Sequence, residues 1–108
     1  MPSTNEYVDY VMSLLSKLDD TSSRKMMGEY VLYYRGKVFG GIYDNRFLVK
    51  ITPHSSSMLS HEEIPYDGAK PMFMVESEDT EFVRRLVDGM YDELPMPKPR
   101  QKKSERKK

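Results

Sequence analysis

The sequence predicts an α+β domain in which an antiparallel sheet of four or five strands packs against an N-terminal and a C-terminal helix. Residues 24–50 contain three short runs rich in Tyr, Phe, Val and Ile, separated by the dipeptides Arg35-Gly36 and Asp44-Asn45. Such dipeptides between apolar runs are typical of two-residue β-hairpin turns. Apolar residues recur at helical spacing in residues 7–18 and 82–94, which predicts one helix on each side of the sheet segment.

The remaining elements follow from local signals. Ser3 and Glu6 have the spacing of a capping box, which predicts that the first helix begins near Ser3. Residues 54–63 suit a short helix or a loop, and the serines beside His54 fit a helix cap better than a nucleophile. Residues 71–75 read as a strand. The acids and hydroxyls of residues 77–80 mark the start of the last helix.

Two-residue turns would fix the register of the sheet, with Leu32 opposite Phe39 and Phe39 opposite Lys50. One face should then pack on the helices, and a slip of one residue would exchange the two faces. The predicted helix-facing set is Val31, Tyr33, Val38, Gly40, Ile42, Phe47, Val49 and Ile51. The predicted core joins Val31, Val38, Ile42, Phe47 and Val49 to Leu14, Leu18, Leu86 and Met90.

Composition limits the class of protein. The 108 residues suffice for one domain, assigned to residues 1–95, and the absence of Cys excludes disulfides and thiolate chemistry. Residues 1–94 hold 10 Lys/Arg and 16 Asp/Glu, whereas residues 95–108 hold seven Lys/Arg and one Glu. We therefore predict a disordered basic tail at residues 96–108. The N-terminus resembles neither a signal peptide nor a membrane span, so we expect a cytoplasmic protein without membrane contact.

No arrangement of residues in the sequence indicates catalysis. His54 and His61 lack metal-ligand spacing, so we expect no metal site. Gly36, Gly40 and Gly41 precede no helix that would receive a phosphate, and we expect Gly40-Gly41 to admit a helix close to the sheet. The sequence therefore predicts a protein that is not an enzyme and has no cofactor.

The face opposite the predicted helix-facing set mixes aromatic and basic residues and is the candidate binding surface. Aromatics between cations on an open sheet can stack bases while the cations hold phosphates. Burial of this face against a helix or a second subunit is the alternative. Uncovered apolar residues there predict a homodimer, and the basic tail predicts weak nucleic-acid contact. The candidate binding residues are Tyr30, Tyr34, Lys37, Phe39, Arg46 and Lys50, and the apolar residues behind the homodimer prediction are Tyr30, Leu32, Phe39 and Leu48.

Three segments in order, RKMMGEYVLYYRGKVFGGIYDNRFLVK at 24–50, YDGAKPMFMVE at 66–76 and YDELPMPKP at 91–99, resemble the TfoX/Sxy N-terminal domain family of bacterial competence regulators. The resemblance implies an α+β domain in a bacterial family linked to transcriptional control of DNA uptake. It implies a non-enzymatic regulatory or interaction domain that acts through protein contacts in bacterial gene control. A nucleic-acid-binding accessory module and a small-molecule-binding domain are the alternatives.

Overall fold

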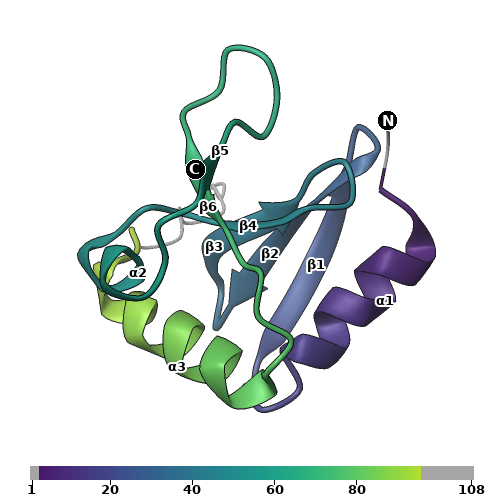
Figure 1. Ribbon diagram of the computed structural model, residues 1–108. Helices are drawn as coiled ribbons and strands as arrows, with labels where there is room; N and C mark the ends of the chain where they lie inside the picture. Colours follow the sequence, from purple (N-terminus) through teal and green to yellow (C-terminus); the bar gives the residue numbers. More distant parts are fainter. Residues whose placement is uncertain (1–2, 96–108) are drawn as a thin grey trace, which may run out of the picture.

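Six antiparallel strands form one sheet in the order β1-β2-β3-β4-β6-β5, and the helices pack against one of its faces (Figure 1). The computed structural model describes residues 3–95, so the predicted basic tail at 96–108 lies outside the described residues. The α+β class is confirmed, with one strand more than the largest number predicted. The elements are α1 (Asn5–Leu14), β1 (Thr21–Met26), β2 (Glu29–Tyr34), β3 (Lys37–Ile42), β4 (Phe47–Val49), α2 (Pro53–Met58), β5 (Glu62–Glu63), β6 (Met72–Met74), α3 (Thr80–Met90) and the 3-10 turn η1 (Tyr91–Glu93).

Three two-residue turns join the first four strands. Both residues of each turn have positive φ, which is the signature of type I′ turns and matches the twist of the flanking strands. The turns at Arg35-Gly36 and Asp44-Asn45 confirm the prediction. The third turn is at Met27-Gly28. It joins β1, which begins at Thr21, to β2, so the first strand pair is a complete hairpin.

The start of α1 differs from the expected capping box. Thr4 is the N-cap, and its hydroxyl accepts from the backbone N–H of Tyr7 at 3.1 Å. The hydroxyl of Ser3 instead donates to Glu29 Oε1 at 2.7 Å and accepts from the Asn45 N–H at 3.1 Å. The residue expected to cap the helix therefore ties the N-terminus to strand β2 and to the β3–β4 turn.

Helix α3 begins where the sequence predicts, α2 forms where a short helix or a loop was expected, and the two helices pack on each other. Thr52 and Ser55 form a reciprocal capping box at the start of α2, and Asp79 caps α3. The ring of His54 lies on Gly89 so closely that a Cβ there would fall 2.2 Å from Nε2. The same nitrogen donates to the carbonyl oxygen of Arg85 at 3.0 Å. His54 thus has a packing role between two helices.

A β-bulge in β3 overturns part of the expected register. Tyr34 faces Lys37 as predicted, but Leu32 faces Gly40 rather than Phe39, so Phe39 is an extra residue in its strand. An inserted residue reverses the faces on one side of the bulge relative to the other. The expected set was therefore right for β4 and wrong for β2 and the start of β3. Val31, Tyr33 and Val38 are half-buried, whereas Leu32, Tyr34 and Phe39 are fully buried.

The core lies between this corrected sheet face and the helices. Ile42, Phe47 and Val49 join it as predicted, together with the predicted helix residues, whereas Val31 and Val38 do not. Leu48 is completely buried but lies outside this core, between Gly41 and Met74 in the neighbouring strands. The apolar residues that predicted a homodimer are thus covered within the chain, except for the half-buried Tyr30. The helix residues of the predicted core are Leu14, Leu18, Leu86 and Met90.

The close approach at Gly40 involves a strand and not a helix as expected. A Cβ on Gly40 would lie 2.2 Å from the carbonyl oxygen of Leu48 and 2.8 Å from the Cα of Val49. Both atoms are backbone, so no side-chain rotation makes room. Glycine at this position therefore permits the bulged strand to pair with β4.

Replacement of Phe47 by Ala should lower the free energy of unfolding by about 3–5 kcal/mol, because its side chain is completely buried in the core. Urea denaturation measures this change. Val49→Ala and Val38→Ala form a matched pair that tests the assignment of the two faces. Val49→Ala should cost about 1.5–3 kcal/mol and Val38→Ala clearly less. Equal losses for the two valines would contradict the corrected register.

Gly40→Ala should destabilise the protein by about 1–3 kcal/mol, because the added methyl overpacks against a strand backbone that cannot yield. Gly68→Ala is an instructive comparison, since Gly68 has positive φ but open space around it. Thermal unfolding of both variants separates backbone strain from steric overlap. A Gly40→Ala variant as stable as the parent protein would show that the bulge relaxes easily.

Candidate functional site

The sheet face opposite the helices carries two hollows, and residues of the β5–β6 loop at 64–71 line both of them. That loop projects from the sheet in Figure 1. We call the larger one the lysine hollow; it has a volume of about 690 Å³. Neither lining includes a residue of a helix. The lysine hollow is lined by Val38, Gly40, Tyr43, Lys50, Ile51, Pro65, Tyr66, Ala69, Lys70, Pro71 and Met72.

The second hollow, which we call the methionine hollow, has a volume of about 470 Å³. It shares Tyr43, Pro65 and Tyr66 with the lysine hollow. The rings of Tyr43 and Tyr66 lie 5.9 Å apart at an angle of 57°, and we call this pair the tyrosine wall. The two hollows are therefore neighbouring parts of one surface that share this wall. The methionine hollow is lined by Met26, Met27, Glu29, Tyr30, Val31, Tyr43, Pro65 and Tyr66.

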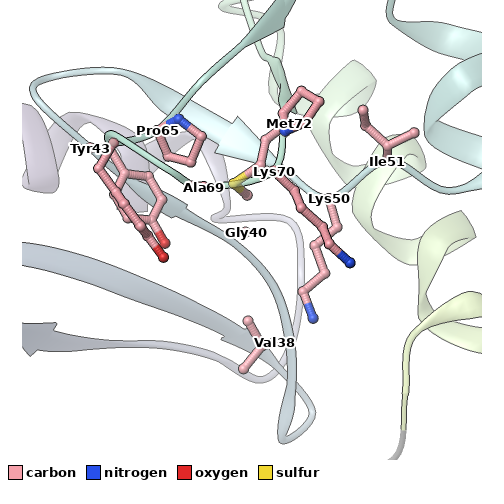
Figure 2. Close-up of a pocket in the computed structure, with 11 residues that line it drawn as sticks. Val38, Gly40, Tyr43, Lys50, Ile51, Pro65, Ala69, Lys70 and Met72 are labelled. Atoms are coloured by element: carbon pink, nitrogen blue, oxygen red, sulfur yellow. The ribbon is translucent and has the colours of Figure 1, made fainter.

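Two lysines converge at one end of the lysine hollow. Figure 2 shows the side chains of Lys50 and Lys70 pointing the same way, with Tyr43 at the opposite end and Gly40 and Met72 between them. The lining contains no Asp or Glu. Within residues 3–95, no ion pair joins either lysine to a carboxylate. The hollow therefore combines positive charge at one end with an apolar middle and an aromatic end.

Arg46 holds the loop against the sheet. Its guanidinium donates to Glu63 Oε1 at 3.1 Å and to the carbonyl oxygens of Ile64 and Pro65 at 3.2 and 3.1 Å. Its Nε donates to the carbonyl oxygen of Tyr43 at 3.1 Å. The planar fork of an arginine suits such divergent acceptors. Arg46 consequently positions Pro65 in the lining of both hollows. Its role is to hold the loop, and it is not one of the lining residues.

His61 continues this hydrogen-bond network through Glu63. Its Nε2 lies 2.7 Å from Glu63 Oε2 and its Nδ1 lies 3.1 Å from Glu76 Oε2. Both nitrogens can donate only in the imidazolium form. The hydrogen bonds to Glu63 and then to Glu76 raise the pKa of His61 above its ordinary value of 6.5. His61 in turn lowers the pKa of Glu63.

The structure separates the six candidate residues predicted from the sequence. Tyr34, Lys37 and Phe39 are buried on the helix side, because the bulge reverses that part of the sheet. The Tyr34 hydroxyl donates to Asp88 Oδ1 at 2.9 Å, and burial, followed by this bond, raises its pKa to about 12. The Lys37 ammonium donates to the carbonyl oxygen of Tyr91 at 3.0 Å. Tyr30 packs against the core, and its hydroxyl lies 3.5 Å from Asn5 Oδ1 on α1, although it also borders the methionine hollow. Lys50 lines the lysine hollow, and Arg46 holds the loop.

Sequence reasoning missed most of the residues that surround Lys50. Lys70, Pro65, Tyr66 and Met72 were not assigned to any site. A signal was present in residues 65–71, where two prolines flank Tyr66 and Gly68. Gly68 has φ of +84°, and the Ala69 N–H donates to the carbonyl oxygen of Tyr66 at 3.0 Å. This ordered turn places Tyr66 and Lys70 beside the sheet.

Two features, a metal-binding group and a membrane-spanning helix, are absent from the described part of the chain. Within residues 3–95, no group of three or more His, Asp or Glu side chains is arranged to hold a metal ion. No helix in the same residues is long and apolar enough to cross a membrane. The hollows, rather than an ionic centre, are the features of this fold that suit binding.

Within residues 3–95, the fold and its hollows define a small α+β domain whose sheet is covered by helices on one face. The model of the TfoX N-terminal domain matches residues 13–85, and the chain belongs to this family. The chain is also 37% identical over 84 residues to a Spirochaeta aurantia protein named "Uncharacterized 12.7 kDa protein in trpE 5'region". That match covers 74% of this chain and 73% of the relative. No solved structure matches the chain.

The His61 network should loosen as the pH rises. A group whose pKa is raised by folding stabilises the folded state fully below its unfolded pKa, and this contribution is lost as the pH rises through the folded pKa. We expect NMR titration to give His61 a pKa above 6.5. Amide exchange in residues 62–71, corrected for intrinsic rates, should be faster at pH 8.5 than at pH 6.

Glu76→Gln is the matched variant for this prediction, because it keeps the shape and removes one negative partner. It should lower the pKa of His61 toward 6.5, since one cause of the upward shift is lost. His61→Gln should remove the pH dependence of loop exchange between these two values. A His61 pKa at or below 6.5 in the parent protein would contradict the described network.

Proposed function

We propose that this chain is a non-enzymatic interaction domain of bacterial gene control and that it binds a partner protein at the methionine hollow. The observation that carries this proposal is the exposure of apolar side chains around that hollow. Met27 has a relative exposure of 101%, and Met26 and Tyr66 are 52% and 60% exposed. Contiguous apolar side chains in solvent mark protein interfaces, and methionine adapts its shape to a partner.

The neighbouring strand defines the kind of partner. Strand β1 is at the edge of the sheet, pairs only with β2, and all its residues after Thr21 are exposed. An open edge accepts an additional strand through backbone hydrogen bonds. Arg24 and Lys25 lie exposed on β1 next to the methionine hollow. The proposed occupant is therefore an extended protein segment with an apolar anchor for the hollow and acidic residues facing these cations.

Two further observations support a regulatory role. The chain belongs to the TfoX N-terminal domain family, and the resemblance described from the sequence links that family to regulators of competence. The linings of the two hollows contain no His, Ser or Thr, which are the usual general bases and hydroxyl nucleophiles. Both histidines have other partners: His54 packs between two helices, and His61 forms hydrogen bonds to Glu63 and Glu76. These observations favour binding over catalysis.

A photo-crosslinking residue at position 27 in the full-length chain should capture a defined protein in cells. The matched control is the same residue at Tyr10, which is 39% exposed on α1. The captured protein is then purified and titrated against the chain. Met27→Asp should weaken that complex at least about tenfold, because it places a charge in an apolar contact, whereas Tyr10→Asp should not.

Strand addition has a separate signature. The outer amide groups of β1 should exchange slowly in the complex and rapidly in the free chain. A complex indifferent to Met27→Asp, or one in which β1 gains no protection, would contradict the proposal. Capture of a second copy, with a dimer in sedimentation at micromolar concentration, would replace the heterologous partner by the homodimer predicted from the sequence. A monomer throughout that range would remove the homodimer.

A further inference from the structure

We propose that the lysine hollow is a binding site for a small organic anion, with the negative group between Lys50 and Lys70 and a flat apolar body against Met72 and the tyrosine wall. This site is distinct from the protein contact proposed above, although both include the tyrosine wall, because the ligand is a small molecule and the two lysines lie outside the methionine hollow. The argument rests on the volume of the hollow, its charge and its shape.

The size suits a metabolite. A volume of about 690 Å³ is in the range of small-molecule sites, which are largely apolar with a few convergent polar groups. Gly40 at the centre contributes no side chain, so the middle of the hollow is open down to the backbone of β3 (Figure 2). The same glycine is required by the close approach of Leu48.

The positive charge of the lysine hollow contrasts with the excess of acidic residues in the rest of the domain. Residues 1–94 carry 16 Asp/Glu against 10 Lys/Arg, yet the lining holds two lysines and no acid. Neighbouring Arg46 is occupied by Glu63, whereas no ion pair joins Lys50 or Lys70 to a carboxylate within residues 3–95. Two like charges that converge without a counter-charge repel each other, and an anion between them removes the repulsion. Charge complementarity therefore selects an anionic ligand.

The opposite end selects the body of the ligand. Tyr43 is half-buried and Tyr66 is 60% exposed, so the rings present both apolar surface and hydroxyl groups. Burial raises the pKa of Tyr43. A tyrosine hydroxyl is protonated at neutral pH even without such a shift, so this group can donate a hydrogen bond. Tyrosine rings stack on flat groups. The basic sequence at residues 98–108 has the same sign of charge as the lysines and is a poor occupant.

Three probes separate charge from shape in the intact chain. Naphthalene-2-carboxylate has both features, naphthalene-2-carboxamide keeps the shape without the charge, and acetate keeps the charge without the body. Titration followed by amide NMR shifts gives affinity and location together. We expect the carboxylate to bind at least about tenfold more tightly than either of the others and to shift the amides of Lys50, Lys70 and Tyr66. Added salt should weaken the carboxylate more than the carboxamide.

Lys50→Met and Lys70→Met remove one charge each while keeping most of the side-chain bulk. Each should weaken the carboxylate about tenfold or more, and Tyr66→Ala should weaken both naphthalene probes. Lys25→Met is the matched control, because it removes an exposed lysine outside both linings. Equal affinity for carboxylate and carboxamide, equal weakening by Lys25→Met, or shifts confined to another surface would each overturn the proposal. These outcomes do not depend on whether a partner protein binds the methionine hollow.

Discussion

One extra residue in β3 determines which side chains of this strand face the core and which line the opposite face of the sheet. Because Phe39 is inserted between the pairs Tyr33–Val38 and Leu32–Gly40, its ring enters the core together with Ile42. The half-buried side chain of Val38 lines the lysine hollow on the other face. Gly40 permits this arrangement, since a side chain there would overlap the backbone of β4. The packing of Phe39 in the core and the place of Val38 in the lysine hollow thus depend on the same local constraint.

On the sheet face opposite the helices, the β5–β6 loop at residues 64–71 packs beside the sheet and lines both hollows. A loop of this kind needs fixed points, because ordering its backbone costs conformational entropy. Arg46 supplies them through the carbonyl oxygens of Ile64 and Pro65, and Glu63 connects it to His61. The hydrogen bonds are concentrated at one end of the loop, close to Pro65. Tyr66 and Lys70 therefore stand beside the sheet on a turn whose base is held and whose outer residues remain exposed.

The sequence was sufficient for the class of fold, two of the turns and the two main helices, because these depend on short-range signals. Asp44-Asn45 and Arg35-Gly36 form turns through their own backbone preferences, and Asp79 caps α3 through its own side chain. The faces of β2 could not be derived from two turns alone, since a bulge changes the pairing without changing either turn. Gly40-Gly41 was the available signal, but glycine within a strand indicates a bulge, a close strand or a close helix equally well. The turn within residues 65–71 had a local signal, but its position beside the sheet depends on hydrogen bonds from the distant Arg46, which no local pattern encodes.

The tyrosine wall gives the two hollows a common element. Tyr43 is held at the β3–β4 turn by backbone hydrogen bonds to Arg46, whereas Tyr66 lies on the loop and is largely exposed. A molecule that moves Tyr66 in one hollow therefore changes the wall of the other. Thermodynamic linkage makes such an effect reciprocal, so a ligand that favours partner binding is itself bound more tightly when the partner is present. Coupling of this kind needs no long pathway through the core, because the shared wall is a single pair of rings 5.9 Å apart. The shared pair of rings would in this way join the proposed small-molecule site to the proposed protein contact.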